Sequence, residues 1–120
     1  MLYIVHNMYR YKNYGDITMA QYIEIPHIGQ VLQDEFLEPL GLSQNALALA
    51  INVPSNRINA IIRGQRSITA DTDLRLTKYF GLSKGYFLRL QNNFELLEAE
   101  RKTALSNIVP FNYNEQKKAM

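Results

Sequence analysis

The sequence has no cysteine and no tryptophan, and His6 and His27 are its only histidines. The missing thiols exclude disulfides and cysteine catalysis, and the two histidines lack the spacing of metal ligands. We therefore predict neither a metal site nor a cofactor. No apolar run approaches the roughly 20 residues that a membrane helix needs, and the apolar "MLYIV" start lacks the basic flank of a secretory signal. These absences predict a cytoplasmic protein without a membrane partner.

Groups typical of an active site are also scarce. No pair of carboxylates accompanies a histidine or lysine in an arrangement suited to acid–base chemistry. Glu95, Glu98 and Glu100 are interpreted as a solvated helix face. We therefore predict that the protein is not an enzyme.

Positive charge is concentrated in the middle third of the chain. The 120 residues include 13 basic and 11 acidic residues, a net charge of +2. Residues 51–90 carry seven basic residues against two acidic ones, whereas residues 27–50 carry three acidic residues and no lysine or arginine. This distribution predicts two faces of opposite sign that the small net charge does not reveal.

The length suits one small domain of roughly 70–90 residues with extensions. Residues 1–24 show no steady period and form a predicted N-terminal extension, in which only "LYIV" and "QYIEI" suggest strands. Met8 and Met19 are alternatives to Met1 as the native start. Residues 25–101 form the predicted domain, and residues 102–120 form a C-terminal extension.

Five helices are predicted within this domain, because apolar residues recur at the helical period between capping and stop residues. Ser43, Thr69 and Ser83 are the expected N-caps, and Gly41, Gly64 and Gly81 the stops. Asp71 and Asp73 fall in the first turn of the fourth helix, where negative charge complements the helix dipole. The predicted fold is all-α, with helices over residues 28–40, 43–51, 55–63 and 70–80 and a fifth helix after Ser83 with an apolar stripe at 87, 90, 94 and 97.

The second and third helices form a predicted helix-turn-helix, since only the short break "NVPS" joins them. In this motif the second helix enters the major groove, and its first residues reach base edges. Arginine suits guanine, asparagine suits adenine and serine suits either base. Ile58, Ile61 and Ile62 have the spacing of the inward face. The predicted contacts are Ser55, Asn56, Arg57 and Asn59 on bases, and Gln44, Arg63, Gln65, Arg66 and Ser67 on the DNA backbone.

Simpler interpretations exist for several of these residues. A short amphipathic helix has a polar face whether or not it binds DNA. Arg75 and Lys78 are interpreted as a solvated face, and Tyr79 and Phe80 as core rather than as a stacking platform. Ala46, Ala48 and Ala50 favour close packing of the second helix.

Residues 28–101 resemble the HigA/VapI-type antitoxins, a branch of the Xre/Cro-repressor-like helix-turn-helix proteins. The most specific matching segments are "EFLEPLGLSQ", "RIN-I-RG-R-ITADT-LRL--YFG" and "LQN-F-L--AE". The resemblance implies a lambda-repressor-like five-helix domain and a homodimer that binds an inverted-repeat operator and represses its own operon. It also implies a HigB-like mRNA-cleaving toxin that the antitoxin neutralises by binding. By position, Ser55, Asn56, Arg57 and Asn59 would read the operator, with Gln44 and Arg66 on phosphates.

The resemblance does not extend to either end of the chain, which leaves the toxin-binding surface open. The N-terminal extension holds five tyrosines; it either packs on its own domain or offers a surface to the toxin or the second subunit. Phe87 and Phe94 are expected in the core. Two alternatives remain, a stand-alone Xre-type regulator without a toxin and a protein-interaction module that does not bind DNA. The expected dimer interface is Leu96, Leu97, Leu105 and Ile108.

Overall fold

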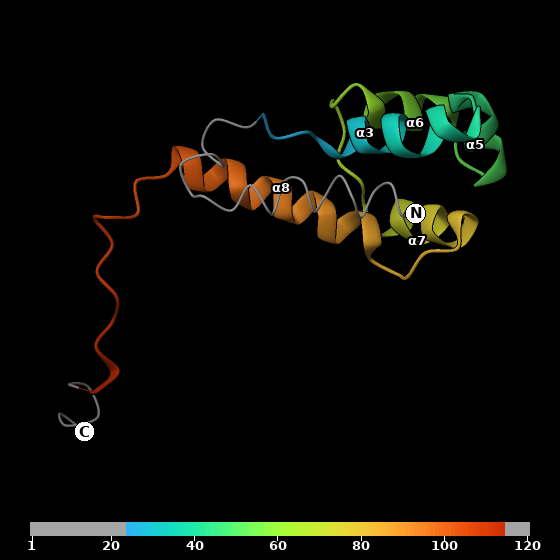
Figure 1. Cartoon of the computed structure of the whole chain (residues 1–120). Helices are drawn as coiled ribbons and strands as arrows, with labels where there is room; N and C mark the ends of the chain where they lie inside the picture. The colour runs from blue at the N-terminus through green and yellow to red at the C-terminus, as the bar shows by residue number, and fades with distance from the viewer. Residues whose placement is uncertain (1–23, 115–120) are drawn as a thin grey trace.

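The computed structural model describes residues 24–114, and every regular element within that range is helical (Figure 1). The possible strands in "LYIV" and "QYIEI" fall largely outside the described residues. The prediction of an all-α, five-helix fold is confirmed. Its helices are the α3–η1–α4 helix, α5, α6, α7 and α8.

The first helix runs without a break through α3 (Ile28–Val31), η1 (Leu32–Leu37) and α4 (Glu38–Leu40), of which η1 is a π-helical segment. Its start is capped by His27, whose Nδ1 accepts a hydrogen bond from the Gly29 amide at 3.1 Å. The Gln30 side chain in turn accepts from the His27 amide at 3.0 Å, which completes a capping box. The sequence did not indicate this cap, because histidine is not among the preferred N-cap residues.

The helix-turn-helix consists of α5 (Gln44–Ala50) and α6 (Ser55–Ile62), joined by residues 51–54, one residue earlier than the predicted break "NVPS". Ser43 caps α5 as expected, since its hydroxyl accepts from the Ala46 amide at 3.0 Å. Within the connection Asn52 has a φ of 58°, a left-handed conformation that asparagine tolerates better than most residues. The turn therefore redirects the chain within four residues.

The last two helices are α7 (Ala70–Phe80) and α8 (Tyr86–Lys102). Thr69 caps α7 as predicted, but the prediction that Ser83 caps α8 is wrong. The Ser83 hydroxyl instead accepts from Arg89 at 3.0 Å. The amides at the start of α8 donate to the buried Asp73 carboxylate, at 2.7 Å from Gly85, 2.9 Å from Phe87 and 3.1 Å from Leu88. Asp73 thus caps a neighbouring helix rather than only complementing the dipole of its own.

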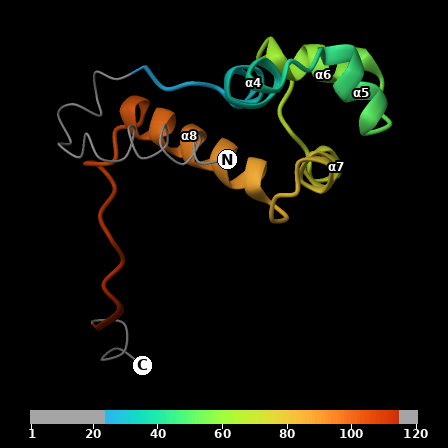
Figure 2. The ribbon, with the colours of Figure 1, turned by 45° about the vertical axis from the view of Figure 1, so that its right-hand side comes forward.

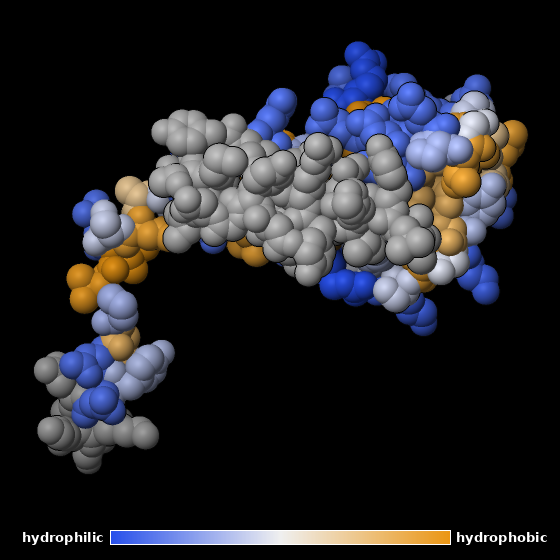
Figure 3. Space-filling view, in the orientation of Figure 1, coloured by the Kyte–Doolittle hydropathy of each residue, from blue (hydrophilic) through white to orange (hydrophobic). Residues whose placement is uncertain are grey.

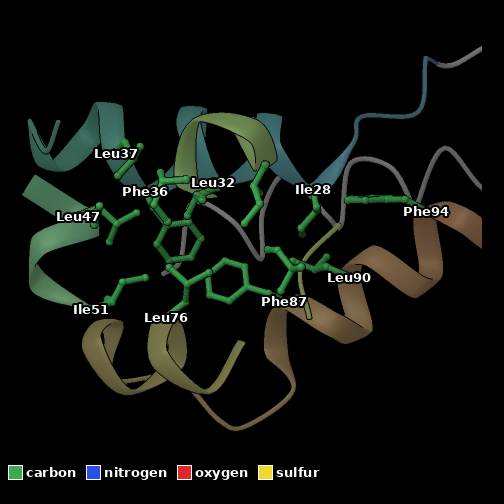
Figure 4. Close-up of a cluster of buried hydrophobic side chains, with 14 residues drawn as sticks. Ile28, Leu32, Phe36, Leu37, Leu47, Ile51, Leu76, Phe87, Leu90 and Phe94 are labelled. Carbon is green, nitrogen blue, oxygen red and sulfur yellow. The ribbon is translucent and has the colours of Figure 1, made fainter. Parts of the chain in front are cut away.

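The core lies where the first helix, α5, α6, α7 and the start of α8 meet (Figure 4). Phe87 and Phe94 are buried in it, as expected. The predicted apolar stripe of α8 leaves the core after Phe94, since every residue from 95 to 102 is exposed. The fully buried apolar side chains, each less than 2% exposed, are Leu32, Leu37, Leu47, Ile58, Ile61, Ile68, Leu76 and Phe87.

Two expectations about packing need correction. Tyr79 is 46% exposed and not in the core, whereas Phe80 packs against the core and lies 4.8 Å from the Phe36 ring. Of the three alanines expected to allow close packing in α5, Ala48 is buried but Ala50 is exposed. Helical period alone does not tell which turn of a helix faces a neighbour, because that depends on how the helices cross.

The first helix approaches α6 closely at Gly29. A Cβ atom on Gly29 would overlap the carbonyl oxygen of Ile61. Glycine at this position therefore sets the distance between the first helix and the helix that carries the predicted base-reading residues.

The C-terminal half of α8 extends beyond the core, and the described chain after Lys102 leads away from it (Figures 1 and 2). Figure 3 shows hydrophobic side chains gathered where the chain leaves α8. The large exposed apolar residues of this region are Leu96, Leu97, Leu105, Ile108, Val109, Phe111 and Tyr113.

Candidate nucleic-acid interface

The start of α6 presents polar side chains to solvent, while its other face is sealed in the core. Ser55, Asn56 and Asn59 are exposed, and Ile58 and Ile61 have no exposed surface. The separation follows from the helical period, which sets residues three apart on one side. The helix is therefore held by its apolar face with its first polar turn outward.

Gln44 and Asn59 lie together across the helix-turn-helix. The Asn59 amide donates to the Gln44 side-chain oxygen at 3.1 Å, joining the first turn of α5 to α6. The bond leaves the Gln44 amide nitrogen as a donor on the same surface. A residue predicted to bind phosphate and one predicted to read a base thus occupy a single contiguous site.

Arg57 is held by an ion pair at the start of α6. Its Nη1 lies 2.9 Å from Asp71 Oδ2, and Arg75 Nε lies 3.1 Å from the same oxygen. The hydrogen bond from Arg75, with the positive charges of Arg75 and Arg57, holds the pKa of Asp71 below its usual range, against a smaller opposing effect of desolvation. The first turn of α7 is therefore part of the surface around the start of α6.

Arg75 does not lie on a simple solvated face, which corrects that expectation. Its Nη1 donates to the carbonyl oxygens of Ile51 at 2.9 Å and Asn52 at 3.3 Å. These carbonyls end α5 and begin the turn, where backbone oxygens lack helical partners. Lys78 is exposed, as expected. Arg75 thus fastens α7 to the turn of the helix-turn-helix.

The basic segment after α6 is exposed and anchored at both sides. Before it, Gly64 adopts a φ of 75° that ends the helix. After it, Ile68 is buried. The Gln91 side chain accepts a hydrogen bond from the Ile68 amide at 2.7 Å and donates one to the Ile68 carbonyl at 3.0 Å. The exposed residues between these anchors are Gln65, Arg66 and Ser67, and Arg63 directly before Gly64 is exposed as well.

The predicted DNA contacts therefore fall into two groups. Gln44, Asn59 and Arg57 gather around the start of α6. Arg66 and Ser67 instead line a pocket beside α8, together with acidic side chains of that helix. The structure brings the first group into one site and sets these last two residues at the other end of α6.

The residues expected at the dimer interface remain on the surface of the single chain. Leu96 and Leu97 are 63% and 40% exposed, and Leu105 and Ile108 are 55% and 67% exposed.

Asp71 and Arg75 belong to the candidate site but were not predicted there. Their i,i+4 spacing on a helix was a readable signal for an ion pair. The link between Arg57 and Asp71 spans 14 residues and two different helices, so no local pattern indicated it.

None of the helices in the described part of the chain is long and apolar enough to cross a membrane.

The short connection between α5 and α6, with the outward polar start of α6, defines a helix-turn-helix protein. A helix-turn-helix family model matches residues 35–87. Virulence-associated protein I of Dichelobacter nodosus is 47% identical over 85 residues, which cover 70% of this chain and 79% of that protein. The chain belongs to the helix-turn-helix family of the HigA/Xre type, a family of antitoxins and transcriptional regulators.

Solved structures agree with this assignment. PA4674 of Pseudomonas aeruginosa, solved in complex with its operator DNA, has a TM-score of 0.69 and 35% identity, covering 74% of this chain and 99% of that chain. An addiction module antidote protein of the HigA family from Coxiella burnetii has a TM-score of 0.68 and 36% identity, covering 74% of this chain and 100% of that chain. The lambda-repressor-like fold that the resemblance implied is thereby confirmed.

Proposed function

We propose that this protein binds an inverted-repeat operator in double-stranded DNA as a homodimer, represses its own operon and neutralises a HigB-like mRNA-cleaving toxin by direct binding. In this proposal the protein acts by binding and not by catalysis, and it acts in the cytoplasm, where the operator is. The observation that carries the proposal is the outward first turn of α6, with Ser55, Asn56, Arg57 and Asn59 beside Gln44.

DNA recognition is supported by the chemistry of this turn. Asparagine and arginine side chains match the edges of adenine and guanine in the major groove, which is wide enough to admit a helix. Gln44 and the exposed segment of residues 63–67 supply donors for phosphates on either side. The structural likeness to PA4674, which was solved on its operator, supports the same use of the fold here.

A homodimer is supported by the apolar surface of α8 and the chain after it. Leu96, Leu97, Leu105 and Ile108 are each at least 40% exposed, more apolar surface than the core of one chain uses. A two-fold dimer sets two recognition helices about 34 Å apart, one turn of B-DNA. One chain alone would read too few base pairs for useful specificity.

The toxin partner is supported by family membership and by the likeness to an antidote protein. The tyrosine-rich extension of residues 1–24 is a candidate contact for the toxin, and residues 1–23 lie outside the described part of the chain. The alternatives remain a stand-alone regulator and an interaction module without DNA binding. Arg57, Arg63 and Arg66 favour DNA binding over the second alternative.

Operator binding is tested by fluorescence anisotropy with duplexes from the promoter of the protein's own gene. Arg57→Ala should cost about 1–3 kcal/mol and relax base preference at one position of each half-site. A uniform loss across all single-base variants would make Arg57 a phosphate contact instead. Lys102→Ala is the matched control, since this exposed cation pairs with Glu98 far along α8.

Salt titration gives an independent measure of the phosphate contacts. About 4–8 contacts per dimer, each contributing about −0.9, give a slope of about −4 to −7 for log K against log salt. A slope near zero would reject DNA binding.

The toxin partner is tested by co-purification with a small basic protein encoded beside the gene. Deletion of residues 1–18, so that the chain starts at Met19, should leave operator binding intact because the helix-turn-helix is untouched. Loss of toxin binding alone would identify the extension as the partner surface. Unfolding would identify it as core, and absence of a neighbouring toxin gene would favour the stand-alone regulator.

A further inference from the structure

We propose that Asp71 is a positioning residue for DNA recognition: it holds Arg57 in one orientation, so that this arginine discriminates between bases rather than binding any phosphate. The inference rests on the proposed operator binding by α6. It assigns to α7 a share in sequence specificity, although α7 lies outside the helix-turn-helix.

The guanidinium of Arg57 is constrained on two sides. Its Nη1 lies 2.9 Å from Asp71 Oδ2, and its side chain is only 24% exposed. Its Nε is buried and has no hydrogen-bond partner among residues 24–114. These constraints leave the second terminal nitrogen for DNA, in a direction fixed by the protein. A fixed donor favours one base edge, whereas a freely rotating arginine follows the nearest phosphate.

The carboxylate of Asp71 is itself anchored. Arg75 Nε binds the same oxygen at 3.1 Å, and the other end of that guanidinium holds the carbonyl of Ile51 at 2.9 Å. A chain of contacts thus runs from Arg57 through Asp71 and Arg75 to the backbone at the end of α5. An isolated exposed ion pair contributes little, but a network anchored on backbone has a defined geometry.

Asp71 also weakens contacts that carry no sequence information. Its side chain is 58% exposed beside the start of α6, where a carboxylate repels phosphate. In a complex with unrelated DNA, Arg57 reaches a phosphate only by leaving the ion pair. Both effects lower the affinity for unrelated DNA. Specificity rises as a result, because it is the difference between the binding free energies for the operator and for unrelated DNA.

The test is Asp71→Asn, which keeps the size of the side chain but removes its charge. The wild type first selects its preferred duplex from a random library, and affinities are then measured for that duplex, its single-base variants and an unrelated duplex. We expect the variant to bind unrelated DNA more tightly and its discrimination at the Arg57 position to fall about tenfold. Asp34→Asn, the same change at an exposed carboxylate of the first helix, should change neither quantity.

Two further variants separate positioning from simple repulsion. Asp71→Glu keeps the charge but moves the carboxylate, so discrimination should fall while the unrelated duplex still binds weakly. In an Arg57→Ala background, Asp71→Asn should cause no further loss of discrimination. An equal loss in that background would overturn the proposal, because Asp71 would then act on DNA directly.

Failure of this inference differs from failure of the proposed function. If the wild type selects no duplex, operator binding itself is wrong. If it selects one, and Asp71→Asn discriminates as well as the wild type, only the role of Asp71 is wrong. Thermal melting of each variant checks that it is folded, and Asp71→Glu provides the decisive comparison if Asp71→Asn is unstable.

Discussion

We expect Asp73→Asn to lower the free energy of unfolding by about 3–5 kcal/mol. Asp73 is 1% exposed, and its two oxygens accept the amides of Gly85, Phe87 and Leu88. An asparagine keeps one side-chain oxygen as an acceptor. Its NH2 group replaces the other oxygen and, being a donor, faces a backbone N–H group that is also a donor. One bond is therefore lost, at a cost of about 1–3 kcal/mol if its amide stays buried, and the remaining bonds lose their charge assistance, worth about 1 kcal/mol each.

The assay is thermal and urea unfolding followed by circular dichroism. For a domain of this size each kcal/mol shifts Tm by about 4–8 °C, so the expected decrease is about 12–40 °C. Asp34→Asn is the control, because Asp34 is an exposed acidic residue of the first helix, and it should shift Tm little. Equal Tm values for the two variants would refute the claim that Asp73 caps α8.

Three further predictions concern packing, pH and assembly. Gly29→Ala should destabilise the domain by about 1–3 kcal/mol in urea unfolding, because its methyl group would overlap the Ile61 carbonyl; a neutral effect would contradict the close approach. Burial, followed by the negative charge of Glu35, raises the pKa of Tyr86. A raised pKa stabilises the fold below about pH 10, and this contribution is lost as pH rises through the folded-state value; Tyr86→Phe should therefore flatten the alkaline loss of stability, and an unchanged pH profile would argue against it. Leu97→Glu should convert the proposed dimer to a monomer in light scattering, and an intact dimer would exclude this part of α8 from the interface.

The helix-turn-helix was predictable because its signals are local. The Ser43 hydroxyl and the amide that it caps are three residues apart, and the isoleucines of α6 repeat at the helical period. The polar start of α6 was readable for the same reason. Side chains and backbone groups this close along the chain meet in almost any context that permits a helix.

Other features required the folded chain. Ser83 had the sequence of an N-cap, yet the cap of α8 comes from Asp73, 12 to 15 residues earlier. Tyr79 was expected in the core, yet its side chain is 46% exposed, whereas Leu76 in the same turn of α7 is buried. Helical period defines an apolar stripe but not where along the helix a neighbour covers it.

The sequence by itself determined the helical class, the position of the helix-turn-helix and which residue types occupy the first turn of α6. Only the tertiary structure decided that Arg57 pairs with Asp71, that Arg75 fastens α7 to the turn, and that Gly29 meets Ile61. The physical reason is separation along the chain. These partners are 14 or more residues apart and lie on different helices, so their contact depends on how helices pack and not on local conformation.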